Sequence, residues 1–175
     1  MQQQTFIKYI SNDEHYTDVL WRSLKVKKRL WIGTANVKDL YIKNVTGAIP
    51  FLGTLSALIQ RKVEVRLIYA KEPGTNFKSD FDKYPALKNG LEMTLCPRVH
   101  FKIIIFDMET AYIGSANLTG AGMGMKSEHT RNFEAGVLTN EPSLVKAAIE
   151  QIDNVWMGKF CGKCKRKAFC KDRIV

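Results

Sequence analysis

The sequence lacks any apolar run long enough to cross a bilayer. Residues 51–59 form its longest nearly continuous apolar stretch, well short of the ~20 residues that a membrane-spanning helix needs. Residues 1–6 have neither the basic start nor the apolar core of a secretory signal peptide. We therefore expect a soluble, cytoplasmic protein with no membrane partner.

Acidic residues are also scarce, and internal repeats and low-complexity segments are absent. The 175-residue chain is 45% apolar and 25% charged, which is ordinary for a globular domain and excludes a disordered or fibrous chain. It has 17 Asp and Glu against 27 Lys and Arg, a net charge of +10. More than half of this excess, a net +6, lies in residues 158–175. Such a basic tail is typical of proteins that bind a polyanion, although a solubilising role is an alternative.

The apolar pattern predicts alternating helices and strands. Ser11 and Glu14 form a capping box, and apolar residues at helical spacing follow it. This order predicts the α/β class, with a mixed β-sheet flanked by helices on both faces and a short Cys-rich basic C-terminal tail. We expect helices over residues 12–28, 48–61, 81–88 and 142–157, and strands over residues 30–37, 63–70, 92–95, 100–106, 111–114 and 132–139.

Polar residues interrupt two neighbouring predicted strands at matching places. His100 and Lys102 alternate along the first strand and so share a face, ~7 Å apart at ~3.3 Å per residue. Ser115 and Asn117 repeat this arrangement at the end of the next strand. If the two strands form a hairpin that turns near residues 108–110, all four side chains converge. An imidazole, an ammonium, a hydroxyl and an amide suit a phosphoryl group, although each alone is also common at a strand edge or turn.

The same residues resemble a known family. The spacing His100-x-Lys102-x4-Asp107, followed by Gly114-Ser115-x-Asn117, resembles the HKD signature of the phospholipase D superfamily. Residues 131–139 resemble the strand that supplies the glutamate of that family, here Glu134. The resemblance implies a phospholipase D-like catalytic domain over residues 1–157, followed by the tail of residues 158–175.

The resemblance also implies how such a chain works. The family has two such motifs per active site and this chain has one, as in the small bacterial metal-independent endonucleases, which are homodimers. One His100 then attacks phosphorus, and His100 of the second copy protonates the leaving oxygen, so no cofactor is needed for catalysis. Glu134 is expected to hydrogen-bond a His100 ring nitrogen. Lys102 and Asn117 hold phosphate oxygens with help from Ser115. Asp107 and Gly114 are structural, with Asp107 holding the turn that follows it.

The charge favours nucleic acid, DNA or RNA, over lipid as the substrate, because contacts to a nucleic-acid backbone are mostly made by Lys and Arg. The tail residues expected to bind it are Lys159, Lys163, Lys165, Arg166 and Lys167. Two alternatives stay open. One is a phospholipase or phosphatidyltransferase of the same superfamily, and the other is a nucleic-acid-binding module with a non-catalytic phosphate site.

The cysteines suggest a second kind of site. Cys161-x2-Cys164-x5-Cys170 lies in the basic tail, and Cys-x2-Cys is half of a zinc-ribbon pattern. Cys96 or His129 could supply a fourth ligand if the tail folds back onto the domain. A structural zinc ion, an iron–sulfur cluster and free reduced thiols are the three interpretations.

Overall fold

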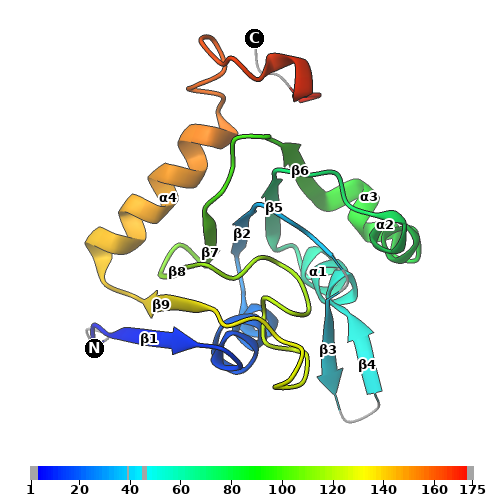
Figure 1. The fold of residues 1–175 in the computed structure, drawn as a ribbon, viewed down its shortest axis with the longest axis vertical. Coiled ribbons are helices and arrows are strands. Elements are labelled where there is room, and N and C mark those ends of the chain that lie inside the picture. Colours follow the sequence, from blue (N-terminus) through cyan, green and yellow to red (C-terminus); the bar gives the residue numbers. More distant parts are fainter. Residues whose placement is uncertain (1–3, 39, 45–46, 173–175) are drawn as a thin grey trace.

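A seven-stranded mixed β-sheet forms the centre of the protein in the computed structural model, which describes residues 4–38, 40–44 and 47–172 (Figure 1). The pairs β2/β5 and β5/β6 are parallel, and the other neighbours in the sheet are antiparallel. In spatial order the strands are β1 (Ile7–Ser11), β9 (Ala135–Thr139), β8 (Thr110–Gly114), β7 (Lys102–Phe106), β2 (Arg29–Thr34), β5 (Glu64–Tyr69) and β6 (Leu91–Leu95).

Helices cover both faces of this sheet, as predicted (Figure 1). On one face α4 (Pro142–Trp156) packs on β7 and β8. On the other lie α1 (Phe51–Gln60), α2 (Thr75–Asp82) and α3 (Pro85–Gly90). The alternation of β7 explains the two layers, because Ile103 and Ile105 join the cluster of α4 residues while Ile104 and Phe106 join the cluster of α1 residues.

The first predicted helix, residues 12–28, is wrong in form. Glu14 does accept hydrogen bonds from the backbone N–H and the hydroxyl of Ser11, at 2.9 and 3.1 Å. However, the chain then forms a π-helix, His15–Leu20, and a 3₁₀ helix, Trp21–Lys25. Aromatic and β-branched residues in this stretch are weak helix formers, and packing on the sheet decides its shape by burying His15, Val19, Leu20 and Ser23.

Other elements differ from the prediction where tertiary pairing overrides local pattern. Strand β1 and the hairpin of β3 (Tyr41–Asn44) and β4 (Gly47–Pro50) were not predicted. Two helices, α2 and α3, replace the single one expected over residues 81–88. Strands β7 and β9 begin at Lys102 and Ala135, so His100 and Glu134 lie just ahead of their strands rather than within them.

The tail folds back onto the end of the sheet. Residues 158–172 form turns and a short 3₁₀ helix, Lys167–Phe169, next to the loop that joins β6 to β7 (Figure 1). The Asp172 carboxylate accepts the backbone N–H of Leu95 at 2.7 Å. Across the described part of the chain, no helix combines the length and apolarity needed to cross a membrane.

Candidate active site

The β7–β8 hairpin brings the two halves of the predicted site together. Lys102 pairs with Gly114 and Phe106 pairs with Thr110, so the start of β7 lies beside the end of β8, as predicted. The turn uses left-handed backbone at Asp107 and Met108, with φ of 54° and 62°, and Glu109 N–H closes it on Phe106 C=O at 3.0 Å. The register therefore fixes which polar residues meet.

Lys102 reaches back to His100. Its Nζ donates to the His100 carbonyl oxygen at 2.7 Å and lies 3.5 Å from His100 Nδ1. His100 is exposed, whereas Lys102 is only 7% exposed. Burial lowers the pKa of Lys102, and the negative charge of Glu134 partly opposes this effect. A partly desolvated ammonium beside an exposed imidazole can stabilise negative charge strongly.

Ser115 and Glu134 form one hydrogen-bonded unit across β8 and β9. The Ser115 hydroxyl donates to the Glu134 carboxylate and accepts the Ala135 N–H at 3.0 Å. Asn132 Nδ2 donates to the other carboxylate oxygen at 2.9 Å. Among the hydrogen bonds of the described residues, the expected one between Glu134 and His100 does not occur, and the Glu134 carboxylate accepts from Ser115 and Asn132 instead.

Asn117 is held by the end of β2. Its Oδ1 accepts the backbone N–H of Asn36 at 3.1 Å and the Thr34 hydroxyl at 3.4 Å. Its amide NH₂ has no partner within the described residues, so it can donate to a phosphate oxygen. Thr34 and Asn36 were not identified from sequence, because nothing in the local pattern links them to a residue about 80 positions away.

Two glycines let the strands close over a buried tyrosine. Tyr112 is fully buried beneath the site, and its hydroxyl accepts the N–H of Ala116 at 3.2 Å. Burial raises its pKa. A Cβ on Gly114 would overlap the Tyr112 hydroxyl and lie 2.7 Å from the Ala135 carbonyl oxygen, and one on Gly136 would lie 2.9 Å from the Ile113 oxygen. Gly114 therefore allows the close approach that joins Ser115 to Glu134.

Comparison with known proteins identifies the family of this chain. The family described as cardiolipin synthase, phospholipase D-like domain, matches residues 23–156. The chain belongs to the phospholipase D-like family. A comparison with curated proteins finds no match.

Solved structures share the fold of this phospholipase D-like domain. NucT from Helicobacter pylori is 12% identical with a TM-score of 0.65, and covers 87% of this chain and 96% of its own. Nuc from Salmonella typhimurium, a phospholipase D family member, is 19% identical with a TM-score of 0.64, covering 87% and 95%. Phosphatidylserine synthase from Haemophilus influenzae Rd KW20 is 16% identical with a TM-score of 0.59, covering 85% and 36%.

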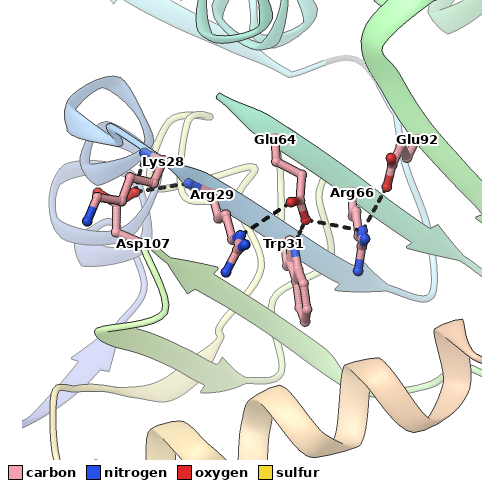
Figure 2. Close-up of polar contacts among 7 residues, drawn as sticks. All are labelled: Lys28, Arg29, Trp31, Glu64, Arg66, Glu92 and Asp107. Atoms are coloured by element: carbon pink, nitrogen blue, oxygen red, sulfur yellow. Dashed lines mark hydrogen bonds and ion pairs between the residues drawn. The ribbon is translucent and has the colours of Figure 1, made fainter. Parts of the chain in front are cut away.

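Asp107 of the phospholipase D-like domain is structural, but it acts on a different segment from the one expected. Its carboxylate accepts the backbone N–H groups of Lys27, Lys28 and Arg29, at distances from 2.6 to 3.1 Å, instead of holding the turn after it. Figure 2 shows the bonds from Lys28 and Arg29. Partial burial alone would raise the pKa of Asp107, but these three N–H groups outweigh it and the pKa is lowered. The aspartate thus ties the β7–β8 turn to the start of β2.

A second polar network lies farther along the same strands (Figure 2). Glu64 accepts Trp31 Nε1 at 2.7 Å and Arg29 Nε at 3.2 Å. Arg66 pairs with Glu92 at 2.7 Å, and its guanidinium lies over the rings of Trp31 and Trp156, at 4.7 and 5.0 Å. This network joins β2, β5 and β6 to α4 and has no sequence-predicted role.

The loop of residues 121–125 points into the protein. Met123 is fully buried, and Gly124 adopts a φ of 68° with its backbone close to Asn12. Its apolar residues therefore belong to the core, and the loop does not offer the apolar surface expected of a lipid enzyme.

The basic tail residues predicted to bind nucleic acid are all exposed: Lys159, Lys163, Lys165, Arg166 and Lys167. One of them, Arg166, donates to the Pro97 carbonyl oxygen at 3.3 Å.

The four cysteines predicted as metal ligands line one cavity of about 520 Å³, and His129 does not line it. In the part of the chain that the structure describes, no three His, Cys, Asp or Glu side chains are already grouped as metal ligands.

Proposed function

We propose that this phospholipase D-like protein is a metal-independent phosphodiesterase that cleaves nucleic acid in an active site shared by two copies. One observation carries the proposal. The β7–β8 hairpin and the start of β9 bring an exposed imidazole, a buried ammonium, an amide donor and a carboxylate to one end of these strands. These are the groups that phosphoryl transfer through histidine requires.

The need for two imidazoles supports a dimer. One chain supplies a single HKD motif, and its His100 is exposed. An isologous interface around a twofold axis brings the same residue from both copies together. The extent of the matches agrees, since this chain spans 96% and 95% of NucT and Nuc but only 36% of the phosphatidylserine synthase.

The proposed reaction has two steps. In the first, a neutral His100 ring nitrogen attacks phosphorus, the phosphorus–oxygen bond breaks, and the protonated His100 of the second copy gives its proton to the leaving oxygen. In the second, water attacks the phosphohistidine, its proton returns to that second imidazole, and the phosphorus–nitrogen bond breaks. Attack by Nε2 requires the imidazole proton on Nδ1, so Nδ1 must donate to an acceptor such as a carboxylate rather than accept from the Lys102 ammonium, which lies 3.5 Å from it.

The remaining residues stabilise charge and geometry. Lys102 and the free NH₂ of Asn117 are suited to bind the non-bridging oxygens, while Ser115 positions Glu134. We retain Glu134 as the residue that orients His100, either its own or that of the second copy. Each carboxylate oxygen can accept a second hydrogen bond, so an imidazole N–H can bind beside the donors Ser115 and Asn132.

Charge and burial favour nucleic acid over lipid. The net charge is +10, the basic tail residues are exposed, and Met123 of the 121–125 loop is buried. The second candidate is phosphatidyl transfer or hydrolysis, because the matching family is described by cardiolipin synthase and one similar structure is a phosphatidylserine synthase.

The test is hydrolysis of bis(p-nitrophenyl) phosphate in excess EDTA by wild type, His100→Ala and His129→Ala. His129 is exposed and lies outside the HKD motif, so His129→Ala is a matched control. We expect activity in wild type and the control and none in His100→Ala. Equal activity in all three would refute the role of His100. Cleavage of single- and double-stranded DNA and RNA, measured beside phospholipid vesicles, then separates the two substrate classes.

A further inference from the structure

All four cysteines of the chain face a common space. Cys96 follows β6, and Cys161, Cys164 and Cys170 lie in the tail, yet each lines the same cavity of about 520 Å³. All four thiols are free of disulfides. Two segments more than 60 residues apart in the sequence therefore line one cavity, and each contributes cysteine to it.

Polar bonds fix the tail in the position that creates this cavity. Asp172 binds the N–H of Leu95 at 2.7 Å, the Cys170 thiol donates to the Leu95 carbonyl oxygen at 3.5 Å, and Arg166 binds the Pro97 carbonyl oxygen at 3.3 Å. These partners flank Cys96 directly. These bonds therefore hold the tail, with its three cysteines, next to the segment that carries Cys96.

The tail has no hydrophobic core of its own. None of residues 158–172 is buried, and Phe160 and Phe169 are 47% and 71% exposed. A segment that buries so little apolar surface gains little from the hydrophobic effect. Short segments of this kind are commonly ordered by a metal ion.

The surroundings of the thiols suit a cation held by thiolates. The Arg166 N–H donates to Cys164 Sγ at 3.4 Å, and Arg98 and Lys167 line the same cavity. The basic side chains around these thiols would offset the net charge of four thiolates on one ion.

We propose that Cys96, Cys161, Cys164 and Cys170 bind one structural zinc ion that fastens the basic tail to the β6–β7 loop. No three potential ligands among the described residues already stand in coordination geometry, so binding draws the four thiols together over the cavity. Four sulfur–hydrogen bonds are replaced by four sulfur–zinc bonds, and the four protons pass to solvent. Cys96 lies four residues before His100, so the ion would hold the tail beside the loop that carries His100.

The experiment uses the full chain, prepared with zinc and without added chelator. Zinc content is measured by mass spectrometry of the metal, and thiol accessibility is measured with a disulfide reagent before and after chelation. We expect one zinc per chain and four thiols that react only after the zinc is removed. Cobalt substitution should give the visible spectrum of a tetrahedral thiolate site.

Single variants show which residues bind. Each of Cys96→Ser, Cys161→Ser, Cys164→Ser and Cys170→Ser should lower the affinity for cobalt at least tenfold, whereas Lys163→Ser, between two of the ligands, should leave it unchanged. Circular dichroism checks that each variant keeps the fold of the sheet. The effect of Cys96→Ser is decisive, because it tests the link between the tail and the domain.

Other outcomes overturn the proposal. Iron with inorganic sulfide would mean a cluster, four immediately reactive thiols in zinc-treated protein would mean no metal, and thiols that react only after reduction would mean disulfides. An unchanged cobalt affinity in Cys96→Ser would mean that Cys96 is not a ligand and that the ion does not link the tail to the β6–β7 loop. These readouts are independent of catalysis, so the zinc proposal can fail while the proposed function stands.

Discussion

Lys102 Nζ lies 2.7 Å from the carbonyl oxygen of His100 and 3.5 Å from its Nδ1. The ammonium therefore holds the backbone of the histidine and at the same time faces its ring. Since Lys102 is 7% exposed, its charge is poorly screened by water at the point where phosphate oxygens would gather. We therefore expect the Lys102 charge to favour activity and to lower the free energy of unfolding.

Lys102→Met should lower kcat for bis(p-nitrophenyl) phosphate by about 10²–10³-fold, the usual effect of losing one donor to a developing charge. The same change should raise the free energy of unfolding at neutral pH by ~0.5–2 kcal/mol, because it removes a desolvated charge. Steady-state kinetics and urea unfolding measure the two effects. A destabilised variant would show that Lys102 holds the fold rather than straining it.

The lowered pKa of Lys102 gives a pH dependence with a defined sign. Between its folded value and the ordinary 10.5, the unfolded chain binds more protons than the folded one. The stability of wild type relative to Lys102→Met should therefore rise with pH in this window. A difference that stays flat up to pH ~10 would argue against burial as the cause.

Asp107→Asn should destabilise the protein by about 1–2 kcal/mol at neutral pH, because a carboxylate that accepts three backbone N–H bonds becomes a neutral amide. The folded pKa of Asp107 is lower than the ordinary 3.8. Its contribution is therefore complete well above that value and is lost as the pH falls through the folded pKa. Unfolding curves of the two proteins should converge in acid, and a constant difference down to pH ~2 would contradict this origin.

Gly114→Ala should cost about 1–3 kcal/mol, because the added Cβ meets the Ala135 carbonyl oxygen and the Tyr112 hydroxyl. Activity should fall with stability, since Ser115 follows directly. Gly162→Ala, in the tail, is the control, because an added Cβ there meets nothing within 4 Å. Thermal unfolding of both variants measures the difference, and equal melting temperatures would contradict the close packing.

A shared active site predicts how mixed dimers behave. When equal amounts of wild type and His100→Ala are unfolded and refolded together, about one quarter of the dimers contain two wild-type chains. Because a mixed dimer has only one His100, activity should fall to about one quarter of that of the same amount of wild type. Independent sites would leave about half. Mixing wild type with His129→Ala should preserve full activity. A linear response to the wild-type fraction would disprove sharing.

Replacing Lys163, Lys165 and Lys167 together by Gln should weaken polynucleotide binding and reduce its salt slope by roughly 2–3, about 0.9 for each lost phosphate contact. Hydrolysis of bis(p-nitrophenyl) phosphate should not change. Removing the charges is a better test than deleting the tail, because Asp172 and Cys170 bind Leu95 at the start of the loop that carries His100. Deletion would therefore also disturb that loop. An unchanged salt slope would place the nucleic acid elsewhere.

Much of the fold could be predicted because it is encoded in local periodicity. The buried strands β2, β5, β7 and β8 and helix α4 all follow apolar patterns of period two or three to four. Strand β1 could not be found this way, since Ile7 and Tyr9 are 61% and 66% exposed and only pairing with β9 makes this segment a strand. The irregular helix at His15–Leu20 likewise depends on what it packs against.

For the site, the sequence by itself determined the reactive groups. The spacing of His100, Lys102, Ser115 and Asn117 is enough to bring them together once a hairpin forms, because the pleat and the turn length fix the register. Only the tertiary structure decided that Asp107 ties down the start of β2, that Thr34 and Asn36 hold Asn117, and that Cys96 faces the tail cysteines. These contacts join segments about 65 to 83 residues apart, and no local pattern encodes such distances.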